Sequence, residues 1–436
     1  MRCLVFGPEL DPSVFRVIEL SRRQLPLLQN LRHLAVYELK PHTWCNITPF
    51  LGPKLSSFAL TSQLGEDTCE SMLVSLNIHA PFLEHLQVLG SAPLSSVGCG
   101  AICSLKHLRT LSTSCIPLTA ECIDHLSVLS NLTELVITTT KDGLAHGASA
   151  AGRETSFASL RVLTISTDTW AVANDFCNVY LRPSSLCTIE VWVGEVPSSR
   201  YLDELFMTLR RCCPVSSLKS ITLLPAEYMD DDPSPDILDP NTLRLLFSFS
   251  NLEELDIRTT ISFVKVDNAL VKGMTLAWPR LKSLQLQPAY TLEGTTSVTL
   301  DGLLPFASCS TLKTLSINLD STIVDSCTRL KPGKSVCNSP LASFVLGEPP
   351  ISDPCAVASF LSDAFPNLKT FMVWEEYDDT LEVVKCWGEA RRLYELFRQK
   401  RAKEADWDDS ADRSAQAMYV YRPYLGFLCL TSLHLS

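Results

Sequence analysis

Apolar residues recur along almost the whole chain in a six-residue pattern. Leu or another apolar residue takes the first, fourth and sixth positions, and Asn, Ser, Pro or Arg usually precedes the first. The twelve intervals between Leu31 and Leu368 average about 28 residues. We therefore expect one repeat unit used many times. The motifs begin at Leu31, Leu55, Leu83, Leu108, Leu132, Leu160, Leu186, Leu218, Leu252, Leu281, Leu312, Leu341, Leu368 and Leu430.

Each motif predicts a β-strand with one buried face. The fourth and sixth residues are two apart, so in an extended chain both side chains point to one side and the residue between them points to the other. The fourth motif has a weak sixth member, Thr113. The residues that flank the core positions are expected to face away from the core.

The segments between motifs predict helices. Ser352-Asp353-Pro354 precedes apolar residues at helical spacing, which is typical of a capped helix start with proline in the first turn. Thr119, Asp239-Pro240 and Tyr201 begin similar runs. A unit of one strand and one helix cannot bury its apolar face alone, so neighbouring units must share a continuous core.

These patterns predict an α/β fold, a leucine-rich-repeat solenoid or horseshoe. Its parallel sheet lies on the concave face and its helices on the convex face. A doubly wound α/β sheet is the alternative, but it does not require leucine at the same positions in every unit. The chain also lacks a Gly-rich phosphate loop after a strand.

The repeat is interrupted near its end, which divides the chain into three expected regions. Residues 1–380 form the solenoid, 381–412 a helical and charged insertion, and 413–436 a final partial repeat. Met1/Leu4/Phe6 fits the motif, so the chain is expected to begin within a repeat, as it is expected to end in one. An acidic loop is expected over Glu227 to Asp239.

The insertion predicts a long amphipathic helix from Leu381 to Lys403 followed by an acidic tract. Its apolar stripe either docks a partner or lies on the solenoid, and the second interpretation is favoured. The stripe consists of Val384, Trp387, Ala390, Tyr394 and Phe397.

Composition narrows the function classes. The formal net charge of −11 argues against a surface that binds a phosphate backbone, so nucleic acid is not an expected partner. The sequence has neither a secretory signal pattern nor a membrane-spanning run, and it predicts a cytoplasmic or nuclear protein. The 17 cysteines lack zinc-site spacing, even in the Cys99/Cys103 and Cys212/Cys213 clusters, and are interpreted as core residues.

Several units resemble repeats of fungal F-box/leucine-rich-repeat proteins, particularly the large sets in mushroom-forming (basidiomycete) fungi. The resemblance rests on Asn30-Leu31-Arg32-His33-Leu34, Phe82-Leu83-Glu84-His85-Leu86, the segment from Phe157 to Leu163, and Phe365-Pro366-Asn367-Leu368-Lys369. In that family an F-box binds the Skp-type adaptor of a cullin ubiquitin ligase, and the repeats hold the protein to be ubiquitinated. No F-box-like segment is visible before the first repeat. The resemblance therefore implies the substrate-holding role, without adaptor binding by this chain.

An enzyme is not expected. The eight histidines are scattered, and the chain contains no HExxH or GxSxG motif. No cofactor or metal site is predicted. The sequence instead favours a protein–protein interaction scaffold, the substrate-recognition domain of an F-box-type ligase receptor. A free-standing leucine-rich-repeat binding protein, or a truncated product without a ligase role, is the alternative.

The partner is expected to be a protein bound on the concave face, centred between the seventh and ninth motifs. Large aromatic residues and arginine dominate interface energetics, which singles out the few large side chains at flanking strand positions. These candidate partner-binding residues are Trp192, Glu190, Glu254, Asp256, Arg258, Trp374 and Tyr37.

Overall fold

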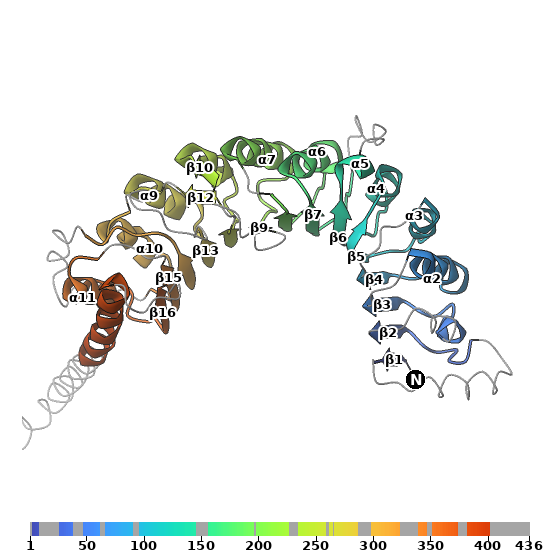
Figure 1. Cartoon of the computed structure of the whole chain (residues 1–436), viewed down its shortest axis with the longest axis horizontal. Helices are drawn as coiled ribbons and strands as arrows, with labels where there is room; N and C mark the ends of the chain where they lie inside the picture. Colours follow the sequence, from blue (N-terminus) through green and yellow to red (C-terminus); the bar gives the residue numbers. More distant parts are fainter. Residues whose placement is uncertain are drawn as a thin grey trace, which may run out of the picture.

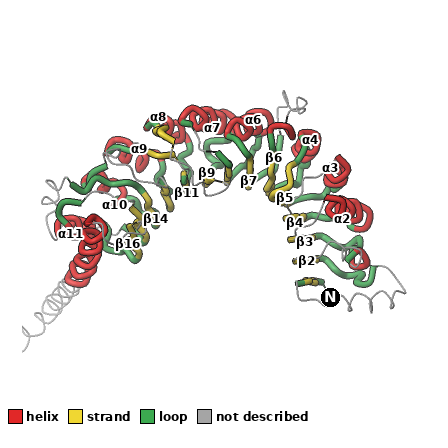
Figure 2. The backbone as a smooth tube through the Cα atoms, viewed as in Figure 1, coloured by secondary structure: helices red, strands yellow, loops and turns green. Residues whose placement is uncertain are grey.

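The chain is an open arc of stacked strand–helix repeats in the computed structural model (Figures 1 and 2). Strands line the inner, concave side of the arc and helices cover the outer, convex side. The residues that the structure describes are 2–7, 26–37, 47–61, 66–89, 96–144, 156–195, 198–225, 234–258, 261–264, 266–286, 298–322, 339–346, 351–373 and 382–401.

One sheet of 14 strands runs the length of the arc, and every neighbouring pair in it is parallel. This confirms the expected leucine-rich-repeat solenoid. Its strands, in spatial order, are β1 (Cys3–Phe6), β2 (His33–Tyr37), β3 (Ser57–Thr61), β4 (His85–Leu89), β5 (Thr110–Pro117), β6 (Glu134–Thr139), β7 (Val162–Thr167), β8 (Thr188–Val193), β9 (Ser220–Pro225), β11 (Glu254–Ile257), β13 (Ser283–Gln285), β14 (Thr314–Ser316), β15 (Ser343–Leu346) and β16 (Thr370–Val373).

The register of this sheet places equivalent motif positions side by side. Leu34 pairs with Phe58, and the same fourth position continues without a break to Phe344 and Phe371. The side chains at this position are 6% exposed or less from β2 to β16. The buried row is therefore shared by all repeats, as the half-core of each unit requires.

A repeated pattern of backbone hydrogen bonds fixes where each strand begins. The carbonyl oxygen of Arg32 accepts two N–H bonds from the next repeat, from Ser56 and Ser57, both at 2.9 Å. The carbonyl oxygens of Glu84 and Lys313 accept equivalent pairs. These pairs of hydrogen bonds connect successive repeats where each strand begins.

Short helices cover the other side of the sheet. They are α2 (Glu66–His79), α3 (Ser96–Cys103), α4 (Ala120–Ser127), α5 (Lys141–Leu144), α6 (Trp170–Tyr180), α7 (Ser199–Cys212), α8 (Pro240–Arg244), α9 (Asn268–Ala277), α10 (Leu304–Ala307) and α11 (Pro354–Ala364), with 3-10 turns η2 (Thr48–Phe50), η4 (Leu245–Ser248) and η5 (Asp301–Leu303). The expected polar caps are present: Thr119, Asp239 and Asp353 each accept a bond from a backbone N–H in the first turn of α4, α8 or α11.

A second, two-stranded parallel sheet was not expected. It pairs β10 (Ser234–Leu238) with β12 (Ile261–Val264), near α7 to α9 (Figure 1). The expected loop over Glu227 to Asp239 is therefore wrong for residues 234–238. The two prolines and two aspartates at 232–236 give no strand-like hydrophobic pattern, and the two strands form outside the repeat motif.

A helix over residues 382–401 packs against the last described strand, close to the bounds expected from the sequence. Trp387 and Tyr394 are 2% and 1% exposed, and their rings contact Phe371 with centroid separations of 5.6 and 6.5 Å. The Tyr394 hydroxyl donates to the Phe365 carbonyl at 2.8 Å, and Arg401 forms an ion pair with Asp363. The apolar stripe therefore lies on the solenoid, where it covers the core.

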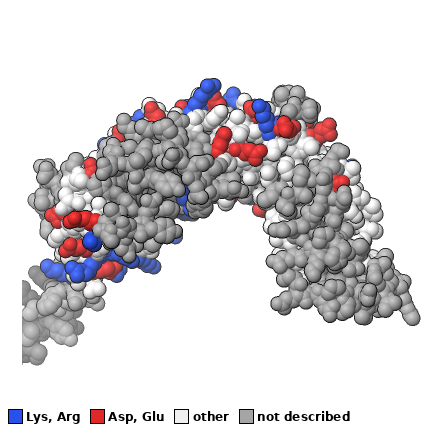
Figure 3. Space-filling view, in the orientation of Figure 1, with Lys and Arg blue, Asp and Glu red and all other residues white. Residues whose placement is uncertain are grey.

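Basic side chains gather on this C-terminal arm of the arc (Figure 3). The expected acidic tract, the partial repeat 413–436 and the motif at Leu430 lie outside the described residues. None of the helices in the described ranges combines the length and the apolar character needed to cross a membrane.

Thr113 generates the first prediction. It occupies a core position, is 0% exposed, and its hydroxyl oxygen has no hydrogen-bond partner among the described residues. Burying such a hydroxyl costs about 1–3 kcal/mol. We expect Thr113→Val to raise the free energy of unfolding by about 1 kcal/mol, measured by urea denaturation. Thr110→Val is the control, because Thr110 is bonded to His85 at 2.9 Å and should give no gain. A loss of stability in Thr113→Val would contradict this account.

The helix over 382–401 generates the second prediction. Trp387→Ala removes a buried indole from the end of the core and should lower the free energy of unfolding by about 3 kcal/mol. Leu396→Ala on the same helix is the matched control, because Leu396 is 55% exposed, and it should change stability by less than about 0.5 kcal/mol. Equal effects of the two substitutions in urea denaturation would show that the helix does not cover the core.

Candidate functional site

Alternate strand residues form exposed rows on the concave face. The fourth and sixth motif residues point into the core, so the third, fifth and seventh residues point to the inner side of the arc. In β8 this gives Glu190 and Trp192, which alternate with the buried Ile189, Val191 and Val193. The parallel register then places each exposed residue beside its equivalents in the neighbouring repeats.

Trp192 and Arg258 lie in one exposed row, separated by a single strand. Trp192 pairs with Leu224 of β9, and the Arg258 backbone N–H donates to Leu223 of the same strand, which places Arg258 beside Leu224. Trp192 is 36% exposed and the Arg258 side chain 52% exposed. An aromatic ring, an aliphatic side chain and a guanidinium therefore line up across β8, β9 and β11.

Acidic residues occupy the two adjacent rows. Glu190 pairs with Thr222, which pairs with Asp256, and Ser220 pairs with Glu254 two residues earlier along the same strands. Glu190 accepts a hydrogen bond from Thr164 at 3.4 Å, and Glu254 accepts one from Ser220 at 3.3 Å. Three of the carboxylates expected from the sequence thus face the same part of the concave surface.

Asp256 and Arg258 also form an ion pair with each other. The Arg258 Nε donates to both carboxylate oxygens of Asp256 at 2.9 and 3.1 Å, and a terminal nitrogen donates at 2.8 Å. Asp256 is 8% exposed, and its burial raises the pKa of the carboxyl above the ordinary value although the guanidinium lowers it. Asp256 therefore holds Arg258 in place, while the more exposed Glu190 and Glu254 face solvent.

The other two candidate residues do not join this group. Tyr37 is 44% exposed on β2, six strands away from β8 in the sheet order. At about 4.8 Å per strand this is about 29 Å along the sheet, too far for one small footprint with Trp192. Trp374 lies outside the described residues.

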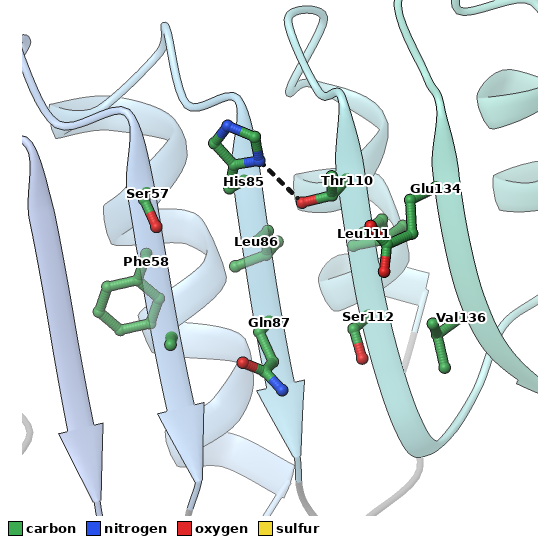
Figure 4. Close-up of a pocket in the computed structure, with 11 residues that line it drawn as sticks. Ser57, Phe58, His85, Leu86, Gln87, Thr110, Leu111, Ser112, Glu134 and Val136 are labelled. Carbon is green, nitrogen blue, oxygen red and sulfur yellow. Dashed lines mark hydrogen bonds between the residues drawn. The ribbon is translucent and has the colours of Figure 1, made fainter. Parts of the chain in front are cut away.

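A hollow that the sequence did not reveal lies nearer the N-terminal end of the concave face (Figure 4). It has a volume of about 340 Å³ over β3 to β6. Small side chains form its floor, among them Ser57, Ala59 and Ser112, and the polar residues His85, Gln87 and Glu134 line it. The candidate residues expected from the sequence are large side chains, whereas this hollow exists where the exposed rows carry small side chains.

His85 and Thr110 form a hydroxyl–imidazole pair in this hollow, with 2.9 Å between Nδ1 and Oγ1 (Figure 4). The Glu84 carboxylate is 4.0 Å from the other ring nitrogen and is paired with Arg109 at 3.1 Å. The backbone N–H groups of Arg109 and Thr110 both donate to the Glu84 carbonyl, so neither can stabilise an oxyanion beside the hydroxyl. The arrangement fits hydrogen bonding to a ligand better than acyl transfer.

Charged residues also line the edge where the strands begin. Glu253 accepts from Lys282 at 2.5 Å and lies 3.4 Å from Lys219, and these lysines hold the pKa of the Glu253 carboxyl below its ordinary value, mainly through the Lys282 hydrogen bond. Within the described ranges, no group of three or more His, Cys, Asp or Glu residues is arranged to hold a metal ion.

No protein-family model matches the chain, and no curated protein matches it. Comparisons with solved structures give remote similarities, of which two are as follows. A crystal structure of an internalin from Listeria monocytogenes is 14% identical, with a TM-score of 0.44, and the match covers 86% of this chain and 91% of that one. A yeast complex of Rad7 and Elc1 is 16% identical, with a TM-score of 0.33, covering 62% of this chain and 74% of that one. We therefore derive the function from the surface of this chain itself.

The Asp256–Arg258 pair generates a prediction about pH. Burial raises the folded-state pKa of Asp256, and Arg258 opposes that rise. Arg258→Ala should therefore raise this pKa further, as measured by carboxyl-carbon NMR titration. Since the charged form would then be less stable in the folded state, the loss of stability should be largest at pH 7 and should shrink as the pH falls through the folded-state pKa. An unchanged Asp256 pKa would contradict the pairing.

Proposed function

We propose that this chain is a protein-binding scaffold whose partner occupies the concave face at β8, β9 and β11. The observation that carries this proposal is the exposed row of Trp192, Leu224 and Arg258. Tryptophan and arginine are the residue types most enriched at interface hot spots. Trp192 lies on β8, and Arg258 directly follows β11 and donates its backbone N–H to Leu223 of β9, so little conformational freedom of the backbone is lost on binding.

The flanking rows favour a partner with a basic segment and an apolar anchor. Glu190 lies in the row next to the apolar pair of Trp192 and Leu224, Glu254 lies one exposed row further along the strands, and Asp256 is neutralised by Arg258. The net excess of carboxylates attracts a cationic segment, while Trp192 and Leu224 offer contact for an apolar side chain. An open curved surface suits a protein better than a small molecule, which requires an enclosed pocket.

The resemblance to F-box/leucine-rich-repeat proteins carries this proposal one step further. On that resemblance the bound protein is a ubiquitination substrate, and the chain is the substrate-recognition domain of a ligase receptor. A free-standing binding protein uses the same surface without the ligase. Affinity purification from the source cells, scored for the Skp-type adaptor and the cullin, distinguishes the two, because a free-standing binding protein brings neither subunit with it.

The affinity of the purified partner provides the direct test. Trp192→Ala should weaken binding by about 2 kcal/mol or more, about a thirtyfold rise in Kd, measured by calorimetry. Met207→Ala is the matched control, because Met207 is a large apolar residue on α7 that is 53% exposed on the convex side. It should leave Kd unchanged. Unchanged affinity in both Trp192→Ala and Arg258→Ala, with a loss in Met207→Ala, would reject the concave site.

A further inference from the structure

Three cysteines from two neighbouring helices meet at a cavity on the helical side of the arc, away from the concave face. Cys99 and Cys103 lie one turn apart on α3, and Cys122 lies in the first turn of α4. All three line a cavity of about 250 Å³, together with Thr119 and Gly143. The sequence showed the Cys99/Cys103 spacing but not Cys122, which the fold brings from the next repeat.

The surroundings of the three thiols shift their pKa values in different directions. All three thiols and Thr119 line the same cavity, and hydrogen bonding from Cys122 and Thr119 lowers the pKa of Cys99. Cys99 is also in the first turn of α3, where the helix dipole favours a negative charge. Donors therefore converge on the Cys99 sulfur.

These donors outweigh the groups that oppose a thiolate. The hydrogen bond from Cys122 is the main cause that lowers the pKa of Cys99 to about 6, against burial and the charge of Glu70. Glu121 acts in the same opposing direction on Cys103, and Asp142 also lines the cavity. The pKa of Cys122 is raised well above the ordinary value, first by its hydrogen bonds to Cys103 and Cys99. The pKa values of Cys99 and Cys122 are therefore shifted in opposite directions, which favours a thiolate at Cys99 and a protonated thiol at Cys122.

We propose that Cys99 and Cys122 form a peroxide-sensitive dithiol, in which Cys99 is the attacking thiolate and Cys122 the resolving thiol. The cavity gives a small hydroperoxide access to the Cys99 sulfur, which is itself 4% exposed. A pair of one thiolate and one neighbouring thiol is the arrangement that converts a sulfenic acid into a disulfide. This site is independent of the proposed protein-binding function.

The chemistry balances with a hydroperoxide as the oxidant. The Cys99 thiolate attacks one peroxide oxygen, so a sulfur–oxygen bond forms, the oxygen–oxygen bond breaks, and the leaving oxygen takes up a proton as water or an alcohol. Cys122 then attacks the sulfur of the sulfenic acid. The disulfide forms, the sulfur–oxygen bond breaks, and a second water leaves with the Cys122 proton. The two thiols lose two electrons in total and the peroxide gains them.

The disulfide would join α3 to α4 and therefore one repeat to the next. Without this disulfide, successive repeats are held together by the hydrogen bonds of the sheet and by the packing of the shared core. A covalent bond on the helical side restrains the angle between these two repeats, near the hollow over β3 to β6. The modification would thus stiffen the N-terminal half of the arc under oxidising conditions.

Peptide mapping of the full chain tests the proposal. The reduced protein is treated with hydrogen peroxide, alkylated and cleaved after basic residues and after glutamate, which separates Cys115 from Cys122 at Glu121. Cys99 and Cys103 stay in one peptide, residues 85–106, so fragment-ion sequencing of the linked peptides assigns the bond to one of them. We expect a Cys99–Cys122 disulfide to form while the exposed Cys3 and Cys355 still react with the alkylating agent. A Cys103–Cys122 bond, or oxidation of Cys3 and Cys355 before Cys99, would overturn the assignment.

Variants separate the two roles and control for misfolding. Cys99→Ser should abolish the disulfide, and Cys122→Ser should leave a Cys99 sulfenic acid that dimedone traps. Cys115→Ser and Cys103→Ser are the matched controls and should retain the Cys99–Cys122 bond. The circular dichroism spectrum of each variant should match that of the wild type. A disulfide at Cys122 in Cys99→Ser, or no dimedone adduct at Cys99 in Cys122→Ser, would refute the proposal.

Discussion

The in-register stacking of buried apolar side chains is the constraint on which the whole structure depends. No single repeat encloses a core, because its strand and helix bury only one side of a shared layer. The uninterrupted row from Leu34 to Phe371 shows that each repeat completes the layer of the one before it. Such a stack must be covered at its ends, and within the described part of the C-terminal arm Trp387 and Tyr394 cover the core next to Phe371.

The same constraint separates what could be predicted from what could not. The strand positions, the helix caps at Thr119 and Asp353, and the docking of the helix over 382–401 follow from local patterns in the sequence. The weak motif member Thr113 is buried like its stronger equivalents because the register leaves it no alternative. The strand pair of β10 and β12 escaped prediction because both strands lie outside the motif and pair only with each other.

The motif spacing predicted where Trp192 and Arg258 lie but not the contacts that the candidate residues make, and their role in partner binding stays a prediction. The motif spacing placed Trp192 and Arg258 two repeats apart on one face, and the strand order confirms that only β9 separates them. The mutual ion pair of Asp256 and Arg258 depends on rotamers, which a pattern of residue types does not contain. The hollow at His85 depends on what is missing from the exposed rows, so a search for large side chains passes over it.

The exposed rows have a consequence for how chains of this kind change over evolutionary time. Their backbone is held by the paired hydrogen bonds where each strand begins and by the buried apolar side chains on the opposite face of the sheet. An exposed residue can therefore be replaced without disturbing either. Only a few positions in each repeat of about 28 residues must stay apolar. Related chains can therefore acquire new partners and lose nearly all recognisable sequence identity while the arc persists. The relationship between such chains is then recognised from the spacing of their leucines rather than from sequence identity.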